Sequence, residues 1–189
     1  MDSNRTFLVI VDMQNDFIDG SLGTPEAAAI VPRVVDRIGS FEGTVVCTLD
    51  THGEDYPETR EGRMLPVPHC IRGTPGWSMP DPVEAALAAR GARRFEKPTF
   101  GSVKLAEFLR DSGAVSVGVI GLCTDICVVS NALMIRAFLP EADVWVDASC
   151  CAGSTPEMHS SALETMRCCQ VRIVGNERCR SGRPIFFIG

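Results

Sequence analysis

Long apolar runs are missing from this sequence of 189 residues, and so is any surplus of positive charge. No stretch approaches the roughly 20 apolar residues that a membrane-spanning helix needs, so we expect no membrane partner. The 18 Lys and Arg residues are outnumbered by 24 Asp and Glu residues, which gives a net charge of −6. Because nucleic-acid phosphates are bound by clustered Lys and Arg, this balance also predicts no nucleic-acid partner.

The sequence also lacks a signal-peptide layout and any CxxC pair. Met1–Arg5 leads directly into a strand-like run, so we expect a cytoplasmic protein. Without a CxxC pair, a structural zinc site built from thiolates is not expected. The nine cysteines are odd in number and include two adjacent pairs, which argues against a disulfide framework. A reactive cysteine must therefore be recognised from its surroundings.

Short apolar runs alternate along the chain with segments of helical periodicity. The expected strands cover residues 7–11, 44–49, 93–96, 115–120, 143–146 and 171–174. The expected helices cover residues 27–38, 81–89, 102–111, 124–139 and 156–169. Strands that are nearly continuously apolar and alternate with helices predict a parallel sheet buried on both faces. We therefore expect an α/β fold, a three-layer α/β/α sandwich with a mostly parallel sheet of roughly six strands, in a single domain spanning residues 1–189.

Three chemically capable residues follow strands of this predicted sheet. Asp12 ends the first strand, Asp50 ends the second, and Cys127 follows the strand at 115–120. Ligands of open α/β sheets bind beyond the carboxyl ends of the strands, so we expect these three side chains to converge. The Pro- and Gly-rich stretch at 51–80 is too long for a plain connection, which indicates a functional loop.

Cys127 lies where the apolar strand pattern gives way to a helix. With Thr124 or Asp125 as the N-cap, Cys127 falls in the first helical turn. Free backbone N–H groups and the positive end of the helix dipole favour a thiolate there, and a thiolate is a nucleophile.

Asp12 and Lys97 are candidate partners for this thiol. A partly buried carboxylate at the end of a strand can act as a general base, although an aspartate there can equally be a cap or turn residue. Pro98 holds Lys97 extended. A lysine near both groups would stabilise the thiolate and orient the carboxylate, whereas one at the surface would only be solvated.

Asp50 and His52 are two positions apart, which places their side chains on the same face of an extended segment. His69 follows in the same loop, and two imidazoles with one carboxylate suit Zn²⁺, Mn²⁺ or Fe²⁺. Glu58 and Glu61 are either further ligands or solvated side chains.

These segments together resemble the isochorismatase-like cysteine hydrolases, and within them the nicotinamidase-like amidases. The resemblance extends from residue 7 to about residue 174. It is carried by Val11–Phe17, Asp50-Thr51-His52, Pro68-His69-Cys70 with Gly73–Gly76, Lys97-Pro98, and Gly121–Val128. It implies a catalytic triad of Asp12, Lys97 and Cys127.

The resemblance also implies a non-proline cis peptide between Leu122 and Cys123. The backbone N–H groups of Cys123 and Cys127 would then form an oxyanion hole. Phe17 and Leu122 would contact the substrate, and Trp77 would either line the same pocket or pack within the loop.

The implied metal ligands are Asp50, His52 and His69, with Glu61 as an addition. The implied cofactor is a divalent ion, Zn²⁺ in the first place and Mn²⁺ or Fe²⁺ otherwise. The resemblance further suggests a homo-oligomer, a dimer or larger.

The implied reaction is hydrolysis of a small carboxamide through a thioester on Cys127, with nicotinamide giving nicotinate and ammonia in NAD salvage. Asp12 would accept the thiol proton, and Lys97 would stabilise the charges. A related amide or ureido (N-carbamoyl) hydrolase and a catalytically degenerate binding protein are the alternatives.

Two departures from the nicotinamidase pattern bear on the substrate. Nicotinamidases commonly carry an aromatic residue shortly before the histidine of the Pro-His-Cys segment, and here that region is Leu65-Pro66-Val67. The metal loop also lacks an additional histidine that some relatives have. The sequence therefore leaves open which amide reaches Cys127.

Overall fold

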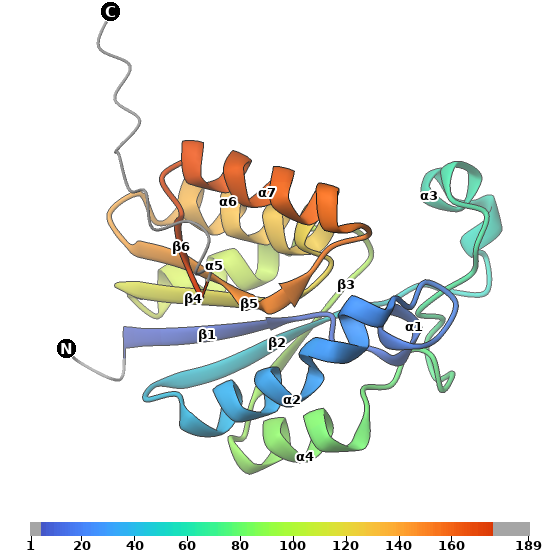
Figure 1. Ribbon diagram of the computed structural model, residues 1–189, viewed down its shortest axis with the longest axis horizontal. Helices are drawn as coiled ribbons and strands as arrows, with labels where there is room; N and C mark the ends of the chain where they lie inside the picture. Colours follow the sequence, from blue (N-terminus) through green and yellow to red (C-terminus); the bar gives the residue numbers. More distant parts are fainter. Residues whose placement is uncertain (1–4, 176–189) are drawn as a thin grey trace, which may run out of the picture.

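The computed structural model describes residues 5–175, and its centre is a parallel sheet (Figure 1). The strand order is β3-β2-β1-β4-β5-β6, and every neighbouring pair is parallel. The strands are β1 (Thr6–Val11), β2 (Thr44–Asp50), β3 (Arg93–Lys97), β4 (Ser116–Leu122), β5 (Asp143–Ala152) and β6 (Arg172–Val174).

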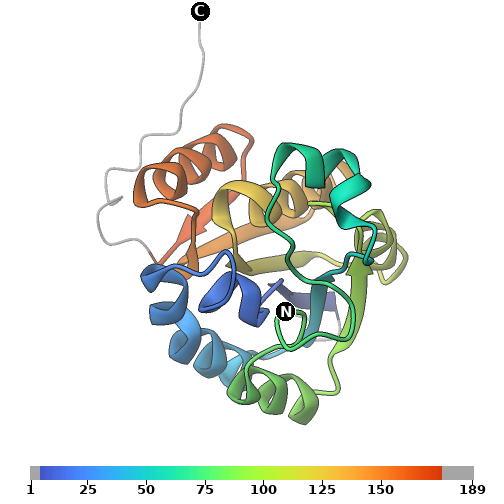
Figure 2. The same cartoon turned by 90° about the vertical axis from the view of Figure 1, so that its right-hand side faces the viewer.

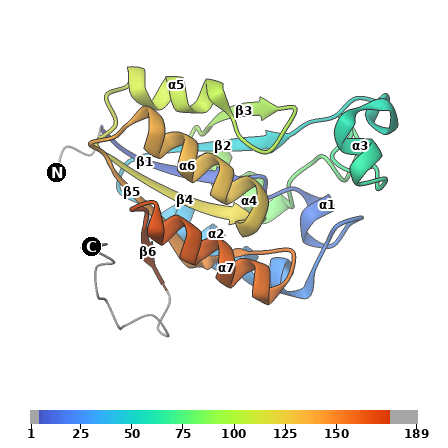
Figure 3. The ribbon, with the colours of Figure 1, turned by 90° about the horizontal axis from the view of Figure 1, so that it is seen from above.

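Helices cover both faces of this sheet. One face carries α2 (Pro25–Ser40) and α4 (Asp81–Ala89), and the other carries α5 (Val103–Asp111), α6 (Val129–Phe138) and α7 (Pro156–Cys168) (Figures 1 and 3). The predicted three-layer α/β/α sandwich with a parallel six-stranded sheet is confirmed. Within residues 5–175, no helix combines the length and apolar character needed to cross a bilayer.

The sheet forms the core because its central strands bury both of their faces. In β1 the residues from Leu8 to Val11 are all fully buried, as a strand covered by helices on both sides requires. Helix α2 buries one stripe of residues three or four positions apart, namely Ala27, Ile30, Val34 and Ile38.

Several segments differ from the expected boundaries, and three of them have a clear structural explanation or a different helix type. Helix α2 starts at Pro25, where Thr24 accepts a hydrogen bond from Ala27 N, and it continues through Gly39 to Ser40 instead of stopping at the glycine. Strand β5 runs on to Ala152, beyond the expected end at residue 146. Asp147, the first residue beyond the expected end, is buried and ion-paired with Arg37, so the strand can continue through this polar residue. The expected helix at 124–139 starts as the π-helical turn η3 (Thr124–Val128) before α6 begins.

Two short helices lie at the edge where the strands end. These are α1 (Asn15–Ile18), which follows β1, and α3 (Arg60–Met64), which lies within the long connection after β2. In Figure 2 this edge faces the viewer, and the connection carrying α3 stands out beyond the strand ends. The same connection includes the 3-10 helix η2 (Tyr56–Glu58).

The carboxyl ends of β1 and β4 approach each other closely at Gly121. Gly121 pairs with Val11 and has a φ of 121°, a conformation that favours glycine. A Cβ at this position would lie 2.1 Å from the Val11 carbonyl oxygen, which is backbone and cannot move aside cheaply. The close approach sets the spacing between the two strands that precede Asp12 and Cys123.

We predict that Gly121→Ala lowers the free energy of unfolding by about 2–4 kcal/mol, because both the φ angle and the Val11 carbonyl oppose a Cβ. Gly39→Ala is the matched control, since a Cβ there meets nothing within 4 Å and the residue is helical. It should raise the free energy of unfolding by about 0.5–1 kcal/mol. Urea denaturation measures the free energy of unfolding of both variants. Equal effects of the two substitutions would contradict the close contact between Gly121 and the Val11 carbonyl.

Candidate active site

Asp12, Lys97 and Cys127 meet in a buried cluster at the carboxyl ends of the strands. The Lys97 ammonium lies 2.7 Å from Asp12 Oδ2 and 3.5 Å from Cys127 Sγ. Lys97 is only 2% exposed and Cys127 only 4%. The sheet therefore brings Asp12 and Cys127 together, as the strand-end pattern predicted, and Lys97 joins them as the family resemblance implied.

Two further side chains support this cluster: Thr48 holds the Asp12 carboxylate, and Gln14 holds the backbone of Asp50 beside it. The Thr48 hydroxyl donates to Asp12 Oδ1 at 2.7 Å. Gln14 exchanges two hydrogen bonds with the backbone of Asp50, at 2.9 Å to its carbonyl and 2.8 Å from its N–H. Asp12 itself adopts a φ of 46°, which is uncommon outside glycine and occurs at functional sites. Sequence reasoning missed Thr48, although a polar residue inside an otherwise apolar strand was the available signal.

The protonation states of Asp12, Lys97 and Cys127 depend on their burial and on the positive charge of Lys97. Burial alone would lower the pKa of Lys97, but the negative charges of Asp12, Cys127 and Asp50 raise it well above its usual value. Burial raises the pKa of Asp12, although Lys97 acts in the opposite direction. Burial, followed by the charge of Asp12, raises the pKa of the Cys127 thiol well above its usual value. The expectation that the helix start favours a resting thiolate is therefore wrong, and Cys127 needs a base.

The turn that carries Cys127 also differs from expectation. Cys123, rather than Thr124 or Asp125, occupies the N-cap position of η3, and no side chain caps the turn. Thr124 Oγ1 instead lies 2.8 Å from His159 Nδ1, and the Asp125 carboxylate accepts hydrogen bonds from Ser154. Both side chains thus anchor η3 to the start of α7. The expected cis peptide between Leu122 and Cys123 is present.

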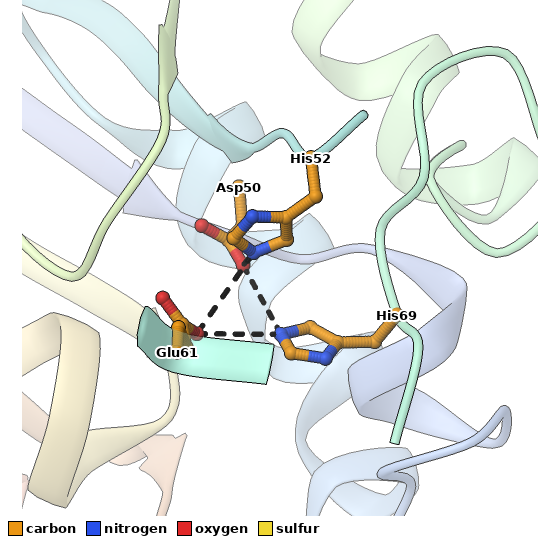
Figure 4. Close-up of side chains that lie close together, drawn as sticks. All are labelled: Asp50, His52, Glu61 and His69. Atoms are coloured by element: carbon orange, nitrogen blue, oxygen red, sulfur yellow. Dashed lines mark hydrogen bonds and ion pairs between the residues drawn. The ribbon is translucent and has the colours of Figure 1, made fainter. Parts of the chain in front are cut away.

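A second cluster of ligand-type side chains adjoins the first. Figure 4 shows Asp50, His52, Glu61 and His69 pointing toward one another, with ligand atoms that all lie within 4.8 Å of each other. Asp50 Oδ2 lies 3.0 Å from His52 Nε2 and 3.5 Å from His69 Nε2. Glu61 Oε1 lies 3.9 Å and 3.7 Å from the same two nitrogens. Glu58, the other carboxylate considered, is exposed and not part of the cluster.

Backbone pairing within the long connection brings these four residues together. His52 forms an isolated parallel bridge with Ile71, and its N–H donates to the Cys70 carbonyl at 3.0 Å. This pairing sets His69 beside His52. Nδ1 of His69 lies 2.9 Å from the Val67 carbonyl, which fixes the proton on that nitrogen and leaves Nε2 free to act as a ligand.

The donor set of this second cluster fits a divalent cation. Two imidazoles and two carboxylates are the ligands that Zn²⁺, Mn²⁺ and Fe²⁺ accept. Burial opposes the ionisation of Asp50, yet the neighbouring imidazoles of His52 and His69 and the charge of Lys97 lower its pKa well below the usual range. Asp50 is therefore anionic, and it connects the two clusters because its Oδ1 lies 3.0 Å from Lys97 Nζ.

The three expected substrate contacts lie in different surroundings. Phe17 is buried and packs against His69, with ring centroids 5.5 Å apart. Leu122 is fully buried at the end of β4. The Trp77 indole packs within the loop, where its N–H donates to Thr51 Oγ1 at 2.9 Å and its ring lies under the Arg72 guanidinium.

A cleft of about 790 Å³ opens beside both clusters. Three segments form its walls. They are the connection that carries α3, the segment that follows β3, and the turn η3 together with the start of α6. Its lining is His52, Thr59, Arg60, Glu61, Met64, Leu65, Pro98, Thr99, Phe100, Asp125, Ile126 and Ser130. None of the three expected substrate contacts belongs to this lining in the described chain.

Burial lowers the pKa of His159, and Asp125 offsets part of this effect. The unfolded chain then binds more protons than the folded one at pH values just below the ordinary histidine pKa of about 6.5. The free energy of unfolding should therefore fall as the pH drops through this range, with the stabilisation fully present above it.

We predict that His159→Asn, which keeps an acceptor for Thr124, reduces the loss of unfolding free energy between about pH 7.5 and about pH 5.5. Urea denaturation at each pH measures the loss. Ser160→Ala, at the exposed neighbouring position, should retain the loss seen in the unsubstituted chain. An identical loss in the His159→Asn protein would show that another group is responsible.

Comparison with known proteins gives three similarities. The isochorismatase domain family matches residues 6–177. The nicotinamidase/pyrazinamidase of Mycobacterium tuberculosis is 32% identical over 189 residues, covering 88% of this chain and 97% of the relative. The crystal structure of the pyrazinamidase of Pyrococcus horikoshii in complex with zinc superposes with a TM-score of 0.75 at 29% identity, covering 91% of this chain and 99% of that one.

A streptothricin hydrolase of Streptomyces noursei is also similar, at 28% identity over 127 residues. The alignment covers 66% of this chain and 46% of that relative.

Proposed function

This chain belongs to the isochorismatase domain family and is a hydrolase of amide bonds, and from that premise we propose that it is a metal-containing cysteine amidohydrolase that converts nicotinamide to nicotinate and ammonia. One observation carries the proposal. The ammonium of a buried lysine lies 2.7 Å from a carboxylate oxygen and 3.5 Å from a thiol sulfur, and all three side chains are almost completely buried. This arrangement supplies a nucleophile, a base and a compensating charge.

In the proposed mechanism, Asp12 removes the proton from Cys127 Sγ as the sulfur attacks the carboxamide carbon. The raised pKa of Asp12 makes it a stronger base than an ordinary aspartate, which suits it to a thiol whose own pKa is raised. Lys97 remains protonated and compensates the negative charge that moves from Asp12 to the sulfur and then to the substrate oxygen. The backbone N–H groups of Cys123 and Cys127 stabilise the tetrahedral oxyanion.

The second half of the reaction reverses the proton transfers. Protonated Asp12 donates to the leaving nitrogen, ammonia departs, and a thioester remains on Cys127. Asp12 then takes a proton from water, whose oxygen attacks the thioester carbon, and nicotinate leaves as the thiol is restored. Atoms and charges balance across the cycle, since the neutral amide and one water give nicotinic acid and ammonia, and the acid then passes its proton to ammonia or to solvent, which leaves nicotinate.

Asp50, His52, His69 and Glu61 would hold a divalent ion, for which we propose Zn²⁺, with Mn²⁺ or Fe²⁺ as alternatives. The zinc in the P. horikoshii pyrazinamidase supports this choice. Such an ion supplies a Lewis-acid position for the substrate's ring nitrogen or for a water molecule. Phe17, which packs against His69, is the proposed wall for the substrate ring.

A related amide or ureido hydrolase is the second candidate function, because Leu65 and Pro66 present no aromatic ring where nicotinamidases commonly have one. The similarity to streptothricin hydrolase supports it. The complete cluster around Lys97 argues against a catalytically degenerate binding protein. The single domain at residues 1–189, the homo-oligomeric state, the cytoplasmic location and the role in NAD salvage stay predictions.

We predict that Cys127→Ala lowers the rate of ammonia release by at least about a thousandfold, because no other group can form the thioester. Metal-loaded protein is assayed with nicotinamide, pyrazinamide and N-carbamoyl amino acids as substrates. Cys168→Ala, at an exposed cysteine on α7, should retain full activity. Ammonia release from none of the substrates would refute both enzyme functions, and unchanged activity of the Cys127→Ala protein would refute the mechanism.

We further predict that His52→Ala and His69→Ala each weaken Zn²⁺ binding by more than about a hundredfold, since each removes a ligand. Isothermal titration of chelator-stripped protein with ZnCl₂ measures the affinity. His159→Ala is the matched control and should bind Zn²⁺ like the unsubstituted chain. Equal affinities for all four proteins would place the metal elsewhere.

A further inference from the structure

The cleft beside the catalytic cluster is larger than the proposed small substrate requires. Its volume of about 790 Å³ falls within the roughly 300–1,000 Å³ typical of pockets that hold drug-sized ligands. Nicotinamide is a single six-membered ring with one carboxamide. Nicotinamide alone would therefore occupy only a small part of the cleft volume.

The cleft adjoins the candidate metal cluster and two of the segments that carry groups proposed to react. His52 and Glu61, from the candidate metal cluster, form part of its wall. Pro98 directly follows Lys97, and Ile126 directly precedes Cys127. A ligand in the cleft would therefore lie next to the candidate metal cluster and next to the two segments that carry Lys97 and Cys127.

The walls of the cleft are mainly apolar and unusually exposed. Met64 is 79% exposed, Leu65 36% and Phe100 43%. These are three of the six large hydrophobic residues that are exposed in the described chain, and all three line this cleft. Exposed apolar side chains that gather at a concave site typically mark a ligand-binding surface.

The charged residues of the lining do not favour a charged ligand strongly. The Asp125 carboxylate already accepts hydrogen bonds from Ser154 N and Oγ, at 2.8 Å and 2.5 Å. Glu61 belongs to the candidate metal cluster. Arg60 is the remaining charged side chain of the lining, and it is exposed at the start of α3, where solvent screens it.

We propose that this cleft binds an apolar extension on the acyl side of the amide substrate, so that the preferred substrate is an alkyl- or aryl-substituted carboxamide rather than nicotinamide itself. The inference rests on the proposed function, because the carboxamide must still reach Cys127. Met64, Leu65, Phe100 and Ile126 form the subsite. The bond that breaks and the products, a carboxylate and ammonia, are unchanged.

The test compares nicotinamide with nicotinamides that carry a butyl group on a ring carbon. A second series carries a carboxylate-ended chain of the same length, which Arg60 would attract. Each methylene buried in the cleft should raise kcat/KM about fourfold, so the butylated amides should exceed nicotinamide by at least about tenfold. The carboxylate-ended amides should show no such gain.

Leu65→Trp should then fill the cleft and lower the ratio of kcat/KM for the butylated amides to kcat/KM for nicotinamide by about tenfold or more. Val115→Trp is the matched control, because Val115 is 39% exposed and precedes β4 at the opposite end of the sheet. It should leave both values unchanged.

The outcomes separate this inference from the proposed function. No turnover of any amide refutes the proposed function itself. Turnover of nicotinamide without a gain for the butylated amides, or a preference for the carboxylate-ended amides, overturns the apolar subsite alone. A loss of activity toward all substrates in Leu65→Trp, with a changed mass by analytical ultracentrifugation, would show that the cleft is covered by a second copy of the chain and would likewise overturn it.

Discussion

The site depends on one buried cation held between two buried carboxylates. Lys97 Nζ lies 2.7 Å from Asp12 and 3.0 Å from Asp50, and all three residues are almost inaccessible to solvent. A charge removed from water at such a place is tolerated only while its partners remain, and removing one partner leaves an uncompensated charge. The ends of β1, β2 and β3 are therefore fixed relative to one another by electrostatics as well as by the sheet. Cys127 and the candidate metal cluster are both positioned against this ion pair.

Much of this arrangement could be predicted from the sequence because parallel strands end at a common edge. Asp12, Asp50 and Cys127 each follow a strand, so the alternating pattern of strands and helices was sufficient to place them together. The strands of the sheet could also be predicted, because strands buried on both faces are recognisable as apolar runs. Boundaries were less certain where a polar residue is itself buried, as Asp147 is within β5.

Features that depend on tertiary contacts could not be predicted in this way. A dipole argument based on a regular helix start favoured a thiolate at Cys127, whereas burial next to Asp12 favours the thiol. The roles of Thr124 and Asp125 depend on α7, about thirty residues away in sequence, and no local pattern shows that they bond to His159 and Ser154 instead of capping the turn. The bridge between His52 and Ile71 is likewise a pairing within an irregular loop, which local periodicity does not reveal.

The close contact between Gly121 and the Val11 carbonyl has a consequence for how such a protein can diversify. Asp12 and Cys127, the proposed base and nucleophile, follow two strands whose separation is set by backbone atoms, so substitutions elsewhere hardly alter the distance between them. The cleft, by contrast, takes Met64 and Leu65 from the end of a five-residue helix in a connection outside the sheet. The proposed base and nucleophile thus reside in a part of the chain that can mutate separately from Met64 and Leu65 of the proposed subsite. Selection, in nature or in the laboratory, can exchange the second without rebuilding the first.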